Sequence, residues 1–510
     1  MRHKISFIIV ALAVIKFVLP FLLQHPVYEL HRDEYLYYQQ GQHLDFGFLE
    51  NPPLIGVLGY LSSMFGGGFF WIKFWSSLFG AATLLVTAGI VKELGGSVYA
   101  QVVAALGIIL TGYLRIHFLF QPNLLDIFFW SLSAYFLLRY INTKENRFLY
   151  LLSLALALGW WSKYSVLFFA ASLFIVLLLT QYRKVFSNRH LWQASALSLL
   201  FILPNLIWQY THRWPLVHHM QELQETQLRY LNRWNFLKEQ LLMLLPVAFV
   251  WIGGLIWLLR QPAYRIIAFL YLGIIVLLMM GSGKGYYALG SYPMLLAAGG
   301  VWLEKATYQK QWARYAVVAL ILLLALPFIP LLLPIQTPEA MARTNQQFGV
   351  EKIGILRWED QQNHALQQDF ADMIGWKELA QKSERFFQQL PDSAKANTIV
   401  YCRSYGQAGA LKYYAQDTYF RQKVICDNGT FLLWIPDRLY FRHLLFIGHR
   451  MPDRDDAVFQ HFQKVMVIDS VTNNLSRQYG DKIIFFENAS DSAWQLANKG
   501  LREMKAAFGQ

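Results

Sequence analysis

The sequence predicts a polytopic α-helical membrane protein that ends in a soluble α/β domain. Of the 510 residues, 55% are hydrophobic and only 15% are charged, whereas about a quarter of the residues of a soluble protein are charged. The apolar residues form long runs, and crossing a bilayer takes roughly 20 such residues. After Pro334 the chain becomes polar and of mixed charge. The boundary between the two expected domains, 1–334 and 335–510, is placed there.

Eleven apolar runs lead us to expect about 11 transmembrane helices. The runs cover residues 5–23, 69–91, 98–113, 124–138, 148–161, 164–179, 191–208, 236–259, 266–280, 286–303 and 315–333. The first run follows the basic start MRHK but has no small-residue cleavage site after it. We therefore expect it to be a retained helix and not a cleaved signal peptide.

The distribution of Lys and Arg predicts the topology. With the N-terminus in the cytoplasm, the basic loops 139–147, 183–189, 260–265 and 305–314 all lie on the cytoplasmic side, as the positive-inside rule requires. Eleven spans then place the C-terminal domain outside. In a bacterium this means the inner (plasma) membrane and a periplasmic domain. The net charge of +13 is explained by these loops, and we expect membrane lipids but no nucleic acid as partners.

The residues after 335 alternate between strand-like and helical patterns, which predicts an α/β domain. The strand-like runs are ANTIVYC, QKVIC, HLLFIG, KVMVID and KIIFFE, and the helical runs are GQAGALKYYAQ and SAWQLANKGLREMKAAF. Cys402 and Cys426 end two of the strand-like runs. They are either a disulfide, which an oxidising compartment allows, or two separate buried thiols.

The first outside loop contains the sequence HRDEY, which includes Asp33 and Glu34. Such a group is either part of a solvated loop or a catalytic site at the membrane surface. Glu50 favours the second reading, because Asn51-Pro52-Pro53 follows it and forms a rigid turn that would fix its direction. The next segment, LIGVLGYLSSMFGG, suits a helix lying in the membrane interface.

Other polar residues near the outer ends of the spans have two interpretations each. His218 and His219 are metal ligands, for which imidazole suits Zn, or polar loop histidines. Lys284 lies between glycines in GSGKGYY and either contacts a phosphate or snorkels at a helix end. Lys163 presents the same choice. Asp126 is either a functional acid at membrane depth or an acid favoured by a helix start.

The order of these segments resembles that of a known group of enzymes. An apolar first helix is followed by "DE", then by LENPPL, QPNLLDIFFWSLSAYFLLRY, LALGWWSKYSVLFF and GKGYYALGSYPMLLAAGGVWLE, and finally by GWKELAQ and YCRSYGQAGALKYYAQ. This order resembles the GT-C glycosyltransferases that use polyprenyl-phosphate sugars, specifically the family 39 and 83 group of protein O-mannosyltransferase-like and aminoarabinose-transferase-like enzymes. The resemblance covers most of the chain, and it implies a GT-C-like membrane domain.

The resemblance also implies roles for individual residues. Asp33 matches the catalytic acid, with Glu34 shaping its electrostatics, and Glu50 matches an acid that binds a divalent metal, Zn, Mg or Mn. His218 or His219 would be a further metal ligand. The residues expected near the donor phosphate or substrate are Arg32, Lys284, Tyr287, Asn51, Asp126 and Lys163.

Two positions depart from the pattern of these relatives. Asn51 stands where aminoarabinose transferases have Lys, which puts that particular sugar in doubt. Asn123 stands where many relatives have Asp, so whether Asp126 takes over that role is open.

The expected reaction is sugar transfer from polyprenyl (undecaprenyl) phosphate to an extracytoplasmic hydroxyl, with inversion and with Asp33 as general base. The acceptor is a lipid, a glycan or a protein. The alternatives are a transporter or channel with a partner-binding outside domain, and a scaffold subunit. A transporter is less favoured because the charged residues gather in loops on one side, not in interrupted helices at the midplane.

Overall fold

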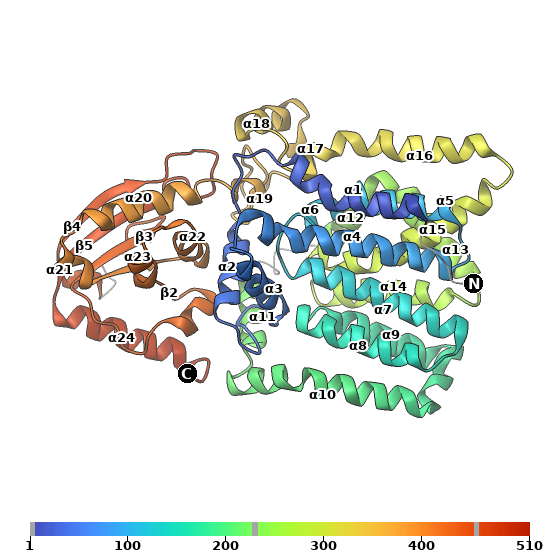
Figure 1. The fold of residues 1–510 in the computed structure, drawn as a ribbon, viewed down its shortest axis with the longest axis horizontal. Helices are drawn as coiled ribbons and strands as arrows, with labels where there is room; N and C mark the ends of the chain where they lie inside the picture. The colour runs from blue at the N-terminus through green and yellow to red at the C-terminus, as the bar shows by residue number, and fades with distance from the viewer. Residues whose placement is uncertain (1–5, 227–232, 453–457) are drawn as a thin grey trace.

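The computed structural model describes residues 6–226, 233–452 and 458–510. Figure 1 shows two parts: a block of long, roughly parallel helices, and a smaller sheet domain formed by the C-terminal residues. The short helices α2 (Arg32–Gln42) and α3 (Leu54–Met64) lie between the two parts. The first loop that was expected outside the membrane therefore contains two short helices, and they lie between the helical block and the sheet domain.

The helical block consists of the expected apolar segments. Its main helices are α1 (Phe7–Leu23), α4 (Phe69–Glu93), α5 (Val98–Ile109), α7 (Asn123–Thr143), α8 (Arg147–Ser162), α9 (Val166–Leu179), α10 (Arg189–Thr211), α13 (Ala248–Arg260), α14 (Arg265–Met280), α15 (Tyr292–Ala306) and α16 (Gln311–Ala325). All eleven runs expected to span the membrane are thus largely helical.

The number of membrane crossings stays a prediction. By length and composition, four of the described helices can cross a membrane, or six if two bent pairs each count as one span. One bent pair joins α12 (Arg233–Met243) to the segment 245–260 at 71°. The sequence did not predict this break, which begins where Pro246 stands in a short 3-10 turn.

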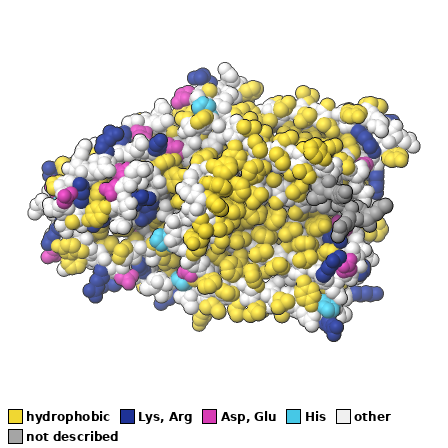
Figure 2. Space-filling model, viewed as in Figure 1, with side chains coloured by type: hydrophobic (Ala, Val, Ile, Leu, Met, Phe, Trp, Pro, Cys, Tyr) yellow, Lys and Arg dark blue, Asp and Glu magenta, His cyan; other side chains and the backbone are white. Residues whose placement is uncertain are grey.

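The outer surface of the helical block is apolar. Figure 2 shows hydrophobic side chains covering the face over these helices, with charged side chains gathered towards the two ends of the block and on the sheet domain. Leu200 of α10 and Leu323 of α16 are among the large hydrophobic side chains that remain exposed. An apolar surface of this extent suits contact with lipid.

The C-terminal domain is built on a five-stranded sheet. Its strands are β1 (Thr398–Cys402), β2 (Val424–Cys426), β3 (His443–Gly448), β4 (Phe462–Ser470) and β5 (Lys482–Ala489), in the order β2-β1-β3-β5-β4. β1 is parallel to β2 and β3, whereas β5 is antiparallel to β3 and β4. The five expected strands and both expected helices are confirmed, and the domain is of the α/β type.

Helices cover both faces of this sheet. Leu379 of α20 (Trp376–Gln389) and Leu411 of α22 (Tyr405–Tyr414) pack in one core with Val400 of β1. Ala493 of α24 (Asp491–Ala506) packs in a second core with Ile399. Adjacent strand residues thus point to opposite faces, as the period of two requires.

The first core also joins the two parts of the molecule. Tyr35 and Leu36 of α2 and Ile55 of α3 belong to the same apolar cluster as Leu379 and Leu411. Gly409 of α22 lets the helices approach closely, because a Cβ there would lie 2.7 Å from the Tyr35 Cβ. The C-terminal domain is therefore packed against α2 and fixes its position.

The two cysteines are neighbours in the sheet. Cys402 and Cys426 are register partners in the parallel strands β1 and β2, and both are buried free thiols. Of the two alternatives left open by the sequence, the structure has the pair of thiols.

Candidate active site

The sequence HRDEY forms the start of helix α2. The His31 Nδ1 accepts the backbone N–H of Asp33 at 3.2 Å, and Glu34 accepts the backbone N–H of His31 at 2.7 Å. This reciprocal capping satisfies two amides that a helix start leaves unpaired. The cluster of ionisable residues is therefore a structured helix N-terminus and not a solvated loop.

Glu34 anchors this helix and does not face the same surroundings as Asp33. Its side chain is fully buried, and both of its oxygens lie 2.7 Å from the Lys73 Nζ on α4. It also accepts the backbone N–H of Phe120 at 2.6 Å. Because these bonds occupy its oxygens, Glu34 fixes the start of α2, and its expected catalytic role stays a prediction.

Asp33 lies where the helical block meets the C-terminal domain. Its Oδ1 accepts the Tyr405 hydroxyl at 2.8 Å and the Arg32 Nε at 3.2 Å, and its Oδ2 accepts the Gln121 amide at 3.2 Å. Burial would raise the pKa of Asp33, but Arg32, His31 and the Tyr405 hydroxyl outweigh it and hold the pKa well below the usual value. Asp33 is therefore ionised at neutral pH.

An ion network surrounds Asp33 and crosses the domain junction. Arg477 lies 2.9 Å from both Glu359 and Asp372, and Glu359 lies 3.9 Å from Arg32. On the opposite side, Arg115 pairs with Asp369, whose carboxylate lies 3.9 Å from the His31 Nε2. These four residues could not be singled out from the sequence, because they are ordinary polar residues of the C-terminal domain: Glu359, Asp369, Asp372 and Arg477.

The C-terminal domain also forms hydrogen bonds to the side chain of Glu50. The carboxylate accepts the backbone N–H of Thr430 at 2.7 Å, a bond from the Thr430 hydroxyl, and the Gln40 amide at 3.3 Å. Gly429 makes this approach possible, since a Cβ there would lie 2.1 Å from a Glu50 oxygen and its φ is +61°. Asn51 is buried and exchanges hydrogen bonds with Gln40 at 3.1 Å, so it supports this turn, and its expected contact with the substrate stays a prediction.

The described residues do not complete the expected metal site. His219 is on helix α11 (Pro215–Thr226) and lies within electrostatic range of Glu50. Burial lowers the pKa of His219; Glu50 partly opposes this shift, and Lys284 adds to it. His218 packs edge-on against Phe508, with the ring centroids 5.6 Å apart. Within residues 6–226, 233–452 and 458–510, no three His, Cys, Asp or Glu side chains are grouped as a metal would require. We derive no step through a metal.

A second polar cluster lies among the membrane helices. Lys163 donates to Asn123 at 2.5 Å and lies over the Tyr287 ring at 4.1 Å. Asp126 accepts the Ser165 hydroxyl at 2.8 Å, and its other oxygen is buried without a partner among the described residues. Asn123 and Asp126 thus lie in one cluster with Lys163.

Lys284 connects the two clusters. It precedes the 3-10 helix η4 (Gly285–Ser291), which carries Tyr287. Burial lowers the pKa of Lys284, which Glu359 and Asp33 partly offset. Lys284 also interacts electrostatically with Lys163. Lys284 therefore lies within electrostatic range of both Asp33 and Lys163.

Comparisons with known proteins identify the fold. ArnT from Cupriavidus metallidurans bound to undecaprenyl phosphate superposes with a TM-score of 0.61 over 95% of this chain and 98% of that chain, at 14% sequence identity. The Archaeoglobus fulgidus oligosaccharyltransferase complex with Zn and sulfate superposes with a TM-score of 0.53, at 12% identity over 86% of this chain and 68% of the other. The chain has the GT-C fold.

Sequence comparisons agree with this fold. A family model described as dolichyl-phosphate-mannose-protein mannosyltransferase matches residues 50–208 of the GT-C chain. Lipid A galacturonosyltransferase RgtD of Rhizobium johnstonii (strain DSM 114642 / LMG 32736 / 3841) is 28% identical over 196 residues. That match covers 38% of this chain and 41% of the relative, so less than half of either protein. The resemblance to GT-C glycosyltransferases seen in the sequence is confirmed.

Sequence reasoning missed Tyr405 and Thr430. They follow the neighbouring parallel strands β1 and β2, and the carboxyl ends of parallel strands are where α/β domains commonly place ligands. That rule, applied to ANTIVYC and QKVIC, was the available signal. The rule identifies the strand ends, but it does not predict that Tyr405 and Thr430 contact Asp33 and Glu50.

Proposed function

We propose that the protein is a membrane glycosyltransferase that moves a sugar from a polyprenyl phosphate to a hydroxyl group of an extracytoplasmic acceptor. The observation that carries this proposal is the environment of Asp33, an ionised carboxylate placed at the outer end of the helical block. Lys284 of the helical block interacts electrostatically with both Asp33 and Lys163. A base and a cationic phosphate site are the two elements that such a transfer needs.

In the proposed reaction, the acceptor hydroxyl gives its proton to Asp33 as its oxygen bonds to the anomeric carbon. The bond between that carbon and the phosphate oxygen breaks in the same step, and polyprenyl phosphate leaves. A single displacement from the opposite face inverts the anomeric configuration. Because Asp33 has a lowered pKa, it accepts the proton late, when the hydroxyl has become acidic.

The leaving phosphate gains negative charge, which cations can stabilise. Lys284 and Lys163 supply positive charge, and the Tyr287 ring holds the Lys163 ammonium at 4.1 Å. Away from bulk water, such fixed charges act strongly on the transition state. The relatives support the nature of the two substrates: the ArnT structure contains undecaprenyl phosphate, and RgtD acts on lipid A. They favour a transferase over the transporter alternative.

The C-terminal domain completes this site. Tyr405 bonds to Asp33, and Thr430 bonds to Glu50, so both carboxylates take their final orientation from the domain. We place the domain on the periplasmic side of a bacterial inner membrane, where the acceptor would meet it. The N-terminus is then cytoplasmic.

The test is sugar transfer in membranes from a panel of radiolabelled polyprenyl-phosphate sugars, comparing wild type with Asp33→Asn. The variant keeps the size of the side chain but cannot take a proton, so transfer should fall by about 10²–10⁴-fold. Asp392→Asn, at an exposed aspartate of the C-terminal domain, is the matched control and should transfer normally. Equal transfer by wild type and Asp33→Asn would remove Asp33 as the base.

A further inference from the structure

A cavity of about 580 Å³ lies at the junction of the two domains, away from the Asp33 cluster. One side is formed by the end of α2 and by residues 66–68, which are all glycine, and the other by α22 and by α23 (Thr418–Lys423). Its volume is typical of sites that bind small molecules, roughly 300–1,000 Å³. The described residues that line it include none of those expected to bind the donor or a metal.

The cavity lies at the far end of the helix pair that positions Asp33. Helices α2 and α22 run side by side in the same direction: Tyr405 at the start of α22 bonds to Asp33 at the start of α2. Near the end of α22, Tyr413 contacts Tyr38, with the ring centroids 5.6 Å apart. Gln42, the last residue of α2, lines the cavity and lies roughly 13 Å along the helix from Asp33, at about 1.5 Å per residue. A ligand there is therefore apart from the proposed site of transfer.

The lining of this cavity is cationic. It contains Lys412 of α22 and Arg421 of α23, and the described residues that line it include no Asp or Glu. The Lys412 ammonium donates to the Arg421 carbonyl at 3.0 Å, and the Arg421 guanidinium donates to the Thr418 hydroxyl at 3.2 Å. The Arg421 Nε is buried without a hydrogen-bond partner among the described residues. Both cations are thus bonded to neutral oxygens and can still bind an anion.

The glycine loop brings backbone donors to the same place. Gly67 has a φ of +65°, and a Cβ there would lie 2.1 Å from the Tyr38 hydroxyl oxygen, so only glycine keeps the loop this close to α2. Gly68 is the N-cap of α4 and makes no side-chain cap bond. The first amides of a helix have no partner within the helix and favour anions. The start of α4 therefore adds to the attraction of Lys412 and Arg421.

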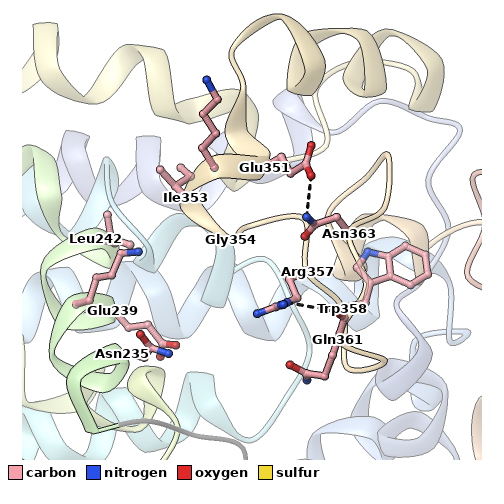
Figure 3. Close-up of a pocket in the computed structure, with 12 residues that line it drawn as sticks. Asn235, Glu239, Leu242, Glu351, Ile353, Gly354, Arg357, Trp358, Gln361 and Asn363 are labelled. Carbon is pink, nitrogen blue, oxygen red and sulfur yellow. Dashed lines mark hydrogen bonds between the residues drawn. The ribbon is translucent and has the colours of Figure 1, made fainter.

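Another cavity at the junction differs in its charges. It lies between α12 and residues 351–363 (Figure 3) and has a similar volume, about 560 Å³. Its lining combines cations with the carboxylates of Glu239 and Glu351, which repel an anion. The described lining of the cavity beside α22 carries positive charge alone, and is therefore the better anion site.

The cavity beside α22 is level with the start of a helix that can cross the membrane. Helix α4 is long and apolar enough to do so, and it begins at Phe69, directly after the glycines. Met64, Phe65 and Phe70 are exposed on either side of the glycines, and Phe65 stacks on Trp71 with the centroids 4.5 Å apart. Aromatic residues at the end of a span are typical of the interface where lipid headgroups lie. A lipid can thus place its headgroup in the cavity and its acyl chains along these side chains.

We propose that this cavity binds the headgroup of an anionic bilayer phospholipid, whose phosphate contacts Lys412, Arg421 and the start of α4. Free phosphate has the same charged group, but the exposed apolar side chains beside the cavity favour the lipid. This lipid is neither the sugar donor nor the acceptor, so the inference does not depend on the proposed function. Because its headgroup contacts both domains, it ties the end of the α2–α22 pair to the membrane surface.

The experiment measures binding in a non-ionic detergent and needs no turnover. Short-chain phosphatidylglycerol, short-chain phosphatidylcholine and inorganic phosphate are titrated separately into the purified full-length protein by calorimetry. We expect phosphatidylglycerol to bind about tenfold or more tightly than the other two, because phosphate lacks acyl chains and the choline cation is repelled by the lining. Equal binding of inorganic phosphate would overturn the lipid assignment. Equal binding of phosphatidylcholine would overturn the requirement for a net negative headgroup.

Gly68 offers a matched pair of variants. Its backbone is extended, and a Cβ there would meet no atom within 4 Å. Asp and Asn are both good N-caps, so neither Gly68→Asp nor Gly68→Asn should destabilise α4. Gly68→Asp places a negative charge in the cavity and should weaken phosphatidylglycerol binding by about tenfold or more, whereas Gly68→Asn should bind as wild type does. Equal binding by the two variants, or no binding by wild type, would overturn the site.

Removal of the two cations gives a second test. Lys412→Gln/Arg421→Gln should weaken phosphatidylglycerol binding by about tenfold or more. Lys499→Gln/Arg502→Gln removes two exposed cations of α24 and should bind as wild type does. Unchanged binding by Lys412→Gln/Arg421→Gln would overturn the assignment of these cations to the phosphate. Asp33→Asn should bind the lipid normally while losing sugar transfer, so a failure of the proposed function would leave this site intact.

Discussion

The two polar clusters of the site are built in different ways. The Asp126–Lys163 cluster is formed within the helical block, by residues of α7, by Ser165 and by η4. The Asp33 cluster is shared, because Arg32 and Gln121 come from the helical block and Tyr405 from the C-terminal domain. The comparison teaches that the proposed phosphate cluster is built by the helical block, whereas the proposed base takes its contacts from both domains.

Within the Asp33 cluster, Glu34 offers the largest expected effect on folding. Glu34→Ala leaves the Lys73 ammonium buried without its partner, and breaking one side of a buried ion pair costs about 3–5 kcal/mol. The thermal unfolding temperature in detergent should fall sharply. Asp33→Asn should lower it far less, although we expect it to reduce transfer strongly. Normal stability of Glu34→Ala would contradict the anchoring role that separates these adjacent acids.

Lys163→Met tests the cluster formed by the membrane part. It removes a positive charge near the leaving phosphate and should reduce kcat by about 10²–10³-fold, the loss seen when one stabilising group is removed from a transition state. Lys144→Met, at the end of α7 opposite to Asn123, is the control and should leave kcat unchanged. A wild-type kcat for Lys163→Met would place the phosphate elsewhere.

Tyr405→Phe tests the contribution of the C-terminal domain to the base. The hydroxyl stabilises ionised Asp33, and a hydrogen bond to a charged group contributes about 1.5–3 kcal/mol. Its loss should raise the pKa of Asp33 from its lowered value. Since ionised Asp33 is the active form, the acid limb of kcat/KM against pH should move to higher pH, and transfer at low pH should fall about tenfold or more.

The exposed Tyr419 provides the control, because Tyr419→Phe removes a hydroxyl of the same domain far from Asp33. Its pH profile should match wild type. A change in activity for Tyr405→Phe with an unshifted acid limb would mean that Tyr405 only supports packing at the junction.

Thr430→Val should have the smallest effect. It removes the hydroxyl bond to Glu50 but keeps the backbone N–H that accompanies it. The loss of one of two such bonds is worth about 1 kcal/mol, or roughly a fivefold decrease in kcat/KM. Gly429→Ala should be more damaging, since its Cβ would collide with the Glu50 carboxylate. Equal, wild-type transfer by both variants would show that the orientation of Glu50 is unimportant.

The same comparison explains what the sequence could predict. Asp126, Lys163 and Tyr287 stand out because polar residues in apolar runs are conspicuous, and their common site follows from helix order. Tyr405, Thr430 and Arg477 lie in a domain where polar residues are unremarkable. Their role depends on how the sheet edge docks against α2, which is a long-range contact that local patterns do not encode. The partner of Glu34 could not be predicted for a related reason, since Lys73 lies 39 residues away.

The fold shows the same division. Strand and helix positions in the C-terminal domain follow from alternation and helical spacing, and all five strands were found. The break between α12 and α13 was missed, because the apolar run continues through the bend at Leu245–Val247. The apolar sequence is continuous there, although the helix is interrupted.

The hydrogen bond from Tyr405 to Asp33 joins residues 372 positions apart. Ribosomes make the chain from its N-terminus, so Asp33 is synthesised early and Tyr405 late, after the whole helical block. A half-made chain can therefore form the Asp126–Lys163 cluster before Asp33 has all of its partners. The contacts of Asp33 are complete only after the last domain has folded onto α2.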